Sequence, residues 1–113
     1  MKRVAYVPDQ GDLVFMDFTP QAGHEQAGRR PAIVLSPRMY NQRAGLCLVC
    51  PITNQAKGYP FEVSMPTHTS VTGVVLSDQI KSVDWVARGV AFKSKAPPEV
   101  LDEVLGRVRA LLA

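Results

Sequence analysis

The sequence predicts a mainly β domain, a small barrel or sandwich, that ends in one amphipathic helix. Several short runs of β-forming residues are separated by turn residues, which is typical of small antiparallel barrels and sandwiches. After Pro97 and Pro98 the apolar residues change to the spacing of a helix face. Because 113 residues suit one domain, we expect residues 1–113 to form a single domain, with the barrel over about 8–93 and the helix over about 97–112.

Three strands are expected in the first half of the chain, each bounded by turn residues: residues 11–18, 30–36 and 46–53. Residues 19–28, between the first two strands, are polar and contain one proline and two glycines. This segment is longer than a typical hairpin loop, so it is a candidate functional loop. Residues 37–45 are expected to be a plain connection.

The second half begins with a polar loop, residues 54–60, and continues with four shorter predicted strands: residues 61–65, 73–78, 80–83 and 86–92. The helix follows, and one of its faces is apolar. That face consists of Val100, Leu101, Val104, Leu105, Val108, Leu111 and Leu112. The apolar face can pack on the barrel, on a partner subunit, or on both.

Composition argues against membrane-spanning and secreted classes. No apolar run approaches the roughly 18 residues that a membrane-spanning helix needs. Lys2 and Arg3 are not followed by the apolar segment of a signal peptide. We therefore expect a cytoplasmic protein without a membrane partner.

Cys47 and Cys50 form a C-x-x-C pair, which a redox site or half of a zinc site could use. They lie in an apolar run that is expected to be a buried strand, where residues three apart point to opposite faces. His24 and His68 are the remaining candidate ligands, and neither has a second histidine at ligand spacing. We interpret both cysteines as core thiols and expect no metal site.

Charge is distributed unevenly although the net charge is only +3. No acidic residue lies between Glu25 and Glu62, and five basic residues do: Arg29, Arg30, Arg38, Arg43 and Lys57. If the fold gathers these side chains on one face, they would attract phosphates. The alternative is an ordinary solvated surface.

Several blocks of sequence stand out between about residue 8 and residue 90. They are G-D-L at residues 11–13, E-Q-A-G-R-R-P at 25–31, A-I-V-L-S at 32–36, C-P-I-T at 50–53, K-G-Y-P-F-E-V at 57–63 and D-Q-I-K-S at 78–82. In their order and spacing these blocks resemble the MazF/PemK toxin family. G-D-L alone is weak, whereas the R-P strand followed by P-I-T and D-Q-I-K-S is specific. The C-terminal helix fits the family in length and matches it weakly in sequence.

The resemblance implies an SH3-like barrel of the kind shared by MazF, Kid and CcdB toxins, and a homodimer. The family cuts single-stranded RNA at short sequence motifs through the neighbouring 2′-hydroxyl, without a metal or other cofactor. The products carry 2′,3′-cyclic phosphate and 5′-hydroxyl ends, and the loss of mRNA stops translation and growth. A cognate MazE-like antitoxin neutralises the toxin, and DNA is contacted only through the toxin–antitoxin complex.

Carried over by position, Arg30 and Thr53 match the catalytic pair of the family, and Glu25 matches an acid of the first loop. The chemistry suits these residue types. An arginine fork can clamp two phosphate oxygens, and a threonine hydroxyl can donate to the same group. Glu25 could accept the 2′-hydroxyl proton, and the neighbouring His24 is its rival. Without the resemblance, Arg30 reads as a surface charge and Thr53 as a β-former near a turn.

Recognition of single-stranded RNA needs basic side chains along the backbone and planar groups on which bases stack. Candidates in or beside the loops are His24, Arg29, Asn41, Lys57, Tyr59, Gln79 and Lys81. Phe61 is a further aromatic candidate, but its position at a strand start favours the core.

Two other functions compete with RNA cleavage. CcdB-like proteins share the barrel and act by binding DNA gyrase, and a plain SH3-like module would bind peptide or nucleic acid without catalysis. The Arg30 and Thr53 pair, in its R-P and P-I-T contexts, favours the RNA-cutting branch. From the same resemblance, a short acidic antitoxin segment is expected to lie along the basic groove and the loop at residues 19–28.

Overall fold

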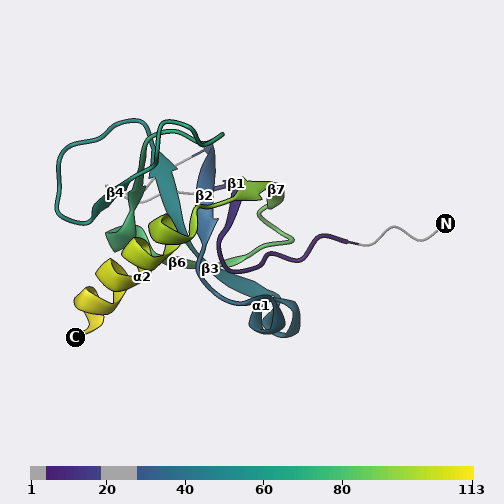
Figure 1. Cartoon of the computed structure of the whole chain (residues 1–113). Coiled ribbons are helices and arrows are strands. Elements are labelled where there is room, and N and C mark those ends of the chain that lie inside the picture. Colours follow the sequence, from purple (N-terminus) through teal and green to yellow (C-terminus); the bar gives the residue numbers. More distant parts are fainter. Residues whose placement is uncertain (1–4, 19–27) are drawn as a thin grey trace.

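The computed structural model describes residues 5–18 and 28–113 (Figure 1). Its strands are β1 (Asp12–Asp17), β2 (Arg29–Val34), β3 (Leu46–Thr53), β4 (Glu62–Ser64), β5 (Val74–Leu76), β6 (Lys81–Asp84) and β7 (Ala91–Lys95). Its helices are α1 (Arg38–Ala44), the single 3-10 turn η1 (Ser77–Gln79) and α2 (Pro98–Leu112). The predicted class, mainly β with a C-terminal helix, is confirmed.

All the strand pairs of the described sheet are antiparallel, and the order is β4-β5-β3-β2-β1-β7. β6 pairs with the first half of β3, from Leu46 to Val49. The last two residues of β3, Ile52 and Thr53, pair instead with β5. The long strand β3 therefore joins the larger part of the sheet to the small β4-β5 hairpin.

Apolar side chains alternate between the two faces of the sheet and form two cores. The first, here called the helix-side core, includes Ile33, Cys50, Ile52, Val63 and Val75 and packs against Val100, Val104 and Val108 of α2. The second includes Val14, Met16, Phe18, Ala32, Val34, Cys47, Val49 and Val83. Because both of their faces are buried, β1, β3 and β5 read as near-continuous apolar runs rather than strict alternations.

The two cysteines lie in different cores, as predicted from their spacing on β3. Cys47 belongs to the second core and Cys50 to the helix-side core, and both are free and fully buried. Burial raises the pKa of each thiol to about 12, and the Asp78 carboxylate adds to the effect at Cys50. Both therefore stay neutral near pH 7 and behave as small apolar side chains.

Helix α2 was predicted correctly and begins with Pro98 in its first turn. Its buried residues are Val100, Val104 and Val108, which are spaced four apart on one face. No helix in the described part of the chain is long and apolar enough to cross a membrane.

The predicted connection at residues 37–45 is wrong, because residues 38–44 form α1. Asn41 is fully buried there and satisfies its amide within the protein. Its Nδ2 donates to the carbonyls of Pro8 (2.8 Å) and Ser36 (2.9 Å), and its Oδ1 accepts from the Ser36 hydroxyl at 2.6 Å. The prediction that Asn41 contacts RNA is therefore wrong in this structure, since its side chain holds the N-terminal segment and α1 together.

The predicted strand at residues 86–92 is also wrong, because residues 85–89 form a turn and β7 runs from Ala91 to Lys95. Asp84 stabilises this turn: its carbonyl accepts from the Arg88 amide at 2.9 Å and its Oδ1 accepts from the Ala87 amide at 3.0 Å. The other strands are confirmed within two residues at each end, and the last two residues of the strand predicted at 73–78 belong to η1.

Candidate active site

Thr53 ends β3 and is 4% exposed. The backbone amide of Gln55 donates to its Oγ1 at 3.1 Å, a local turn in which a hydroxyl accepts from the chain two residues on. Because this bond uses a lone pair of the oxygen, the hydroxyl hydrogen can still be donated to a ligand. The turn thus fixes the position of the hydroxyl and preserves its donor capacity.

The backbone of Thr53 is held by a close approach of Gly73. Gly73 has φ +109°, and a Cβ built on it would lie 2.2 Å from the Thr53 carbonyl oxygen and 2.9 Å from Asn54 Oδ1. Only glycine fits both the backbone conformation and the space. The Thr72 hydroxyl donates to the same Asn54 Oδ1 at 3.0 Å, so the segment before β5 braces the end of β3.

Arg30 lies near the start of β2, half-buried and paired with Met16 of β1. The register between β2 and β3 pairs Ala32 with Pro51 and Val34 with Val49. Continued by two residues, this register puts Arg30 across from Thr53. Side chains directly opposite each other in an antiparallel pair share a face, so this register would put the two predicted residues on one face of the sheet.

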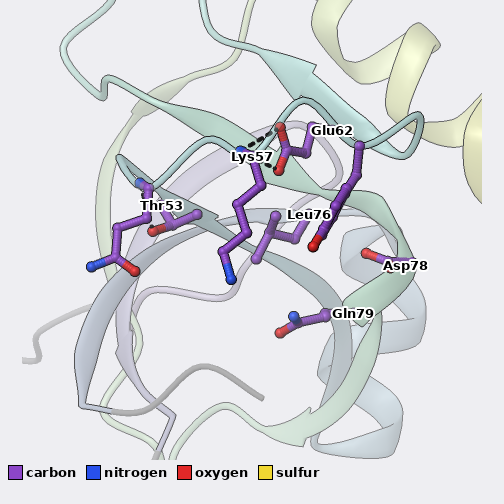
Figure 2. Close-up of a pocket in the computed structure, with 8 residues that line it drawn as sticks. Thr53, Lys57, Glu62, Leu76, Asp78 and Gln79 are labelled. Carbon is purple, nitrogen blue, oxygen red and sulfur yellow. Dashed lines mark hydrogen bonds between the residues drawn. The ribbon is translucent and has the colours of Figure 1, made fainter. Parts of the chain in front are cut away.

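A pocket of about 350 Å³ opens beside Thr53 (Figure 2). Its lining comes from the end of β3, the following loop, β4, β5 and η1: Thr53, Gln55, Lys57, Tyr59, Glu62, Leu76, Asp78 and Gln79. Val63 and Val75 point into the helix-side core, so the alternation of the strands turns Glu62 and Leu76 to the opposite, pocket face. Figure 2 shows the Lys57 side chain reaching into the space between Thr53 and Gln79.

Glu62 organises the loop that forms one wall of this pocket. Its carboxylate accepts from the backbone amide of Lys57 at 3.0 and 3.2 Å and from that of Gly58 at 3.0 Å (Figure 2, for Lys57). From the other side, Arg107 of α2 donates to the Pro60 carbonyl and is itself paired with Glu103 at 3.0 Å. The loop backbone is therefore tied both to β4 and to α2.

Four side chains of the pocket lining make no hydrogen bond or ion pair to another described residue: Gln55, Lys57, Tyr59 and Asp78. Tyr59 is 58% exposed, whereas Leu76 is 7% exposed. The pocket therefore combines a buried apolar surface with polar groups that are available to a ligand.

The other predicted site residues divide into three groups. Lys57, Tyr59 and Gln79 line the pocket, and Lys81 lines an adjoining hollow of about 170 Å³ that shares Asp78 and Gln79 with it. Arg29 donates to the Gly89 carbonyl at 3.0 Å and so contacts the turn before β7. The predictions for Glu25 and His24 fall outside the described residues.

Sequence reasoning missed four residues of the lining: Gln55, Glu62, Leu76 and Asp78. Asp78 was adjacent to a predicted residue, Gln79, in the D-Q-I-K-S block. The signal that could have found Gln55 and Glu62 is their position in, and just after, a polar loop that already carried Lys57 and Tyr59. Leu76 carried no signal, since an apolar strand residue reads as core.

In residues 5–18 and 28–113, no group of three or more His, Cys, Asp or Glu side chains could hold a metal ion. Arg30 and Thr53 can instead bind an anion through N–H and O–H donors. Such an arrangement can stabilise negative charge that develops on a phosphate.

Comparison with known proteins gives concordant matches. The Escherichia coli K12 endoribonuclease toxin MazF is 50% identical over 107 residues, which cover 95% of this chain and 96% of that protein. The endoribonuclease toxin ChpB of the same strain is 41% identical over 111 residues, covering 92% and 93%. Both relatives are thus matched along nearly their whole length.

Solved structures match as well. The crystal structure of MazF from Deinococcus radiodurans has a TM-score of 0.92 and 56% identity, covering 96% of this chain and 98% of that one. A MazE-MazF crystal structure from the same species has a TM-score of 0.86 and 50% identity, covering 96% and 98%. Residues 9–112 match the family described as the PemK-like, MazF-like toxin of type II toxin-antitoxin systems. This chain belongs to that family.

Proposed function

We propose that this protein is an endoribonuclease toxin that cuts single-stranded RNA at a short motif and thereby stops translation and growth. The observation that supports the proposal is the register of β2 and β3: continued by two residues, it would set Arg30 across from Thr53, which lines the pocket. The endoribonuclease names of the E. coli relatives support the same activity.

In the proposed reaction, a 2′-hydroxyl attacks the neighbouring phosphorus, and the bond from phosphorus to the 5′ oxygen breaks. Arg30 clamps the non-bridging oxygens and the Thr53 hydroxyl donates to the same group. Glu25, or His24 in its place, accepts the 2′-hydroxyl proton, and the departing 5′ oxygen gains a proton. The products are a 2′,3′-cyclic phosphate and a 5′-hydroxyl, and no metal or cofactor takes part.

Donors placed where charge develops contribute strongly to such a step. Removing one donor from a well-studied oxyanion site slows the reaction about 100- to 1000-fold. We expect losses of that order for Arg30→Ala and for Thr53→Ala. The oxygen of Thr53 is already fixed by Gln55, so the hydroxyl needs little reorganisation when a phosphate arrives.

Regulation is proposed by likeness to the MazE-MazF complex of D. radiodurans. A short acidic segment of a MazE-like antitoxin would lie along the acid-free stretch and the loop at residues 19–28, blocking RNA sterically and electrostatically. Reversing Arg29, Lys57 and Lys81 to glutamate should then relieve inhibition. We further propose a cytoplasmic homodimer that contacts DNA only in the antitoxin complex.

The test is to incubate the purified protein with mixed single-stranded RNA in excess EDTA, beside Arg30→Ala and Thr53→Ala. Exposed Arg109→Ala and Thr67→Ala serve as matched controls, since both lie outside the proposed site. Fragment ends are mapped by sequencing and their chemistry is identified.

Cuts at a recurring motif with cyclic-phosphate ends, lost in both site variants and kept in both controls, are expected. Intact RNA with every protein would overturn the proposal and favour a non-catalytic poison of the CcdB kind. Cleavage that EDTA abolishes would overturn metal independence alone.

A further inference from the structure

The pocket beside Thr53 contains two unpartnered side chains of opposite hydrogen-bonding character. The Asp78 carboxylate only accepts hydrogen bonds, and the Lys57 ammonium only donates them. Neither has a side-chain partner among the described residues, although Glu62, the other carboxylate of the lining, is engaged by the backbone of Lys57 and Gly58. The Asp78 carboxylate is therefore a hydrogen-bond acceptor that no described residue uses.

The remaining lining suits a flat, partly apolar group. Leu76 offers a nearly buried apolar surface, and Tyr59 offers an exposed aromatic ring at the same pocket. The volume of about 350 Å³ is in the range of pockets that enclose small organic ligands. Unpaired bases bind in such places by stacking on aromatic rings and hydrogen bonding along their edges.

The Asp78 carboxylate also disfavours one kind of ligand, a negatively charged group. Asp78 would repel a phosphate, so the RNA backbone is disfavoured at this end of the pocket. A base edge that presents an N–H donor to Asp78 and an acceptor to Lys57 or Gln55 satisfies the carboxylate and one of these two donors. Cytosine, adenine and guanine offer this pair, because each has an exocyclic amine beside a ring-nitrogen acceptor. Uracil has no amine, and its ring N–H lies between two carbonyl oxygens that would face the carboxylate.

We propose that this pocket reads one base of the RNA by its exocyclic amino group and that Asp78 is the residue that determines this preference. The inference rests on the proposed endoribonuclease function and adds to it the chemical class of one recognised base. Leu76 and Tyr59 hold the base plane, and Lys57 and Gln55 bind its acceptor edge.

The first test uses the wild-type protein and modified substrates. After the cut motif is mapped, each cytosine, adenine or guanine in it is replaced, one at a time, by the analogue that lacks only the amino group: the pyrimidin-2-one ribonucleoside, the purine ribonucleoside or inosine. One replacement should lower kcat/KM by about tenfold, in line with the value of a good base contact. The base whose replacement has this effect is the one that the pocket reads. Cleavage of every analogue at the parent rate would overturn the proposal.

The second test uses Asp78→Asn, which keeps the size of the side chain and exchanges one acceptor for a donor. Exposed Asp102→Asn on α2 is the matched control for the loss of one charge. Asp78→Asn should relax the motif at a single position, and that position should no longer respond to the amino-deleted analogue. Asp102→Asn should leave the motif unchanged.

The outcomes separate the inference from the function on which it rests. If the wild-type protein cuts no RNA, the proposed function fails. If Asp78→Asn cuts with the wild-type motif at every position, or if the mapped motif contains uracil alone, the inference fails while the endoribonuclease stands.

Discussion

The end of β3 and the loop that follows it are neighbours in sequence but are held in different ways. Thr53 is fixed at both backbone and side chain, by the approach of Gly73 and by the Gln55 amide. In the loop, Glu62 fixes the backbone of Lys57 and Gly58, whereas the side chains of Lys57 and Tyr59 have no partner among the described residues. A rigid hydroxyl suits proposed catalysis, and loosely held side chains suit the recognition of a ligand that brings its own partners.

The largest expected effect comes from breaking the rigid region with Gly73→Ala. The added methyl would meet the Thr53 carbonyl and the backbone would be strained, so we expect a loss on the order of 2 kcal/mol or more in the free energy of unfolding. We also expect a lower kcat for RNA cleavage. Gly45→Ala is the control, because Gly45 has φ +70° with open space around it.

Denaturant unfolding and steady-state cleavage measure both effects. Gly45→Ala should show the strain alone, with kcat unchanged. Equal losses in the two variants, with kcat preserved in both, would show that the close approach to Thr53 does not position the site.

The next effect comes from loosening the recognition loop with Glu62→Ala. The amides of Lys57 and Gly58 would lose their acceptor, and a hydrogen bond to a charged group is worth about 1.5–3 kcal/mol. We expect kcat/KM to fall about tenfold, mainly through KM, with little change at saturating RNA. Glu62→Gln keeps one acceptor oxygen and should recover part of the loss. A fall in kcat with unchanged KM would contradict the division between the two regions.

A smaller effect is expected for Thr72→Val, which removes the hydroxyl that donates to Asn54 and keeps the shape of the side chain. The bond is exposed, so a loss of about 0.5–1 kcal/mol in stability is expected, with a drop in kcat of a few-fold at most. Thr72→Ser should restore both values. Unchanged stability and kcat in Thr72→Val would mean that the hydrogen bond to Asn54 does not matter here.

At pH 8, the smallest effect concerns the two thiols of β3, which report on the rigid region without perturbing it. Burial raises the pKa of both to about 12, so at pH 8 the native protein should react with a thiol reagent only as fast as it unfolds. Between the ordinary value of 9.0 and about 12, the unfolded thiols ionise while the folded ones do not, so stability should fall as pH rises through that window. Rapid labelling of native protein at pH 8 would show that β3 opens locally.

Much of the fold followed from local patterns. The strand at residues 46–53 and the helix at the C-terminus have strong, continuous apolar signals, and the opposite orientation of Cys47 and Cys50 follows from strand geometry alone. Helix α1 was missed because seven residues are too few to form a stable helix on their own, although most of them are good helix formers. It depends on distant partners: Asn41 bonds to Pro8 and accepts from the Trp85 indole at 2.9 Å.

The residues of the candidate site that belong to family motifs could be predicted from the sequence. The residues that only the folding of the chain brings to the pocket could not. Arg30, Thr53, Lys57, Tyr59 and Gln79 belong to motifs that can be read along the chain. Leu76 and Glu62 enter the pocket only because β4 and β5 pair in a register that turns both to the same face. The strand expected at residues 86–92 failed for a related reason, since capping by Asp84 makes a turn of residues that include the β-former Val86.

The bond from Arg107 to the Pro60 carbonyl ties α2 to the loop that forms one wall of the pocket, although no residue of α2 lines the pocket. The sequence blocks that resemble the family, from residue 11 to residue 82, all lie before this helix. Substitutions that accumulate on it can therefore shift the loop at residues 54–61 while leaving every lining side chain unchanged. Two toxins with identical pocket residues can therefore differ in the position of this loop, and under the proposed function they would then differ in the RNA motif that they cut.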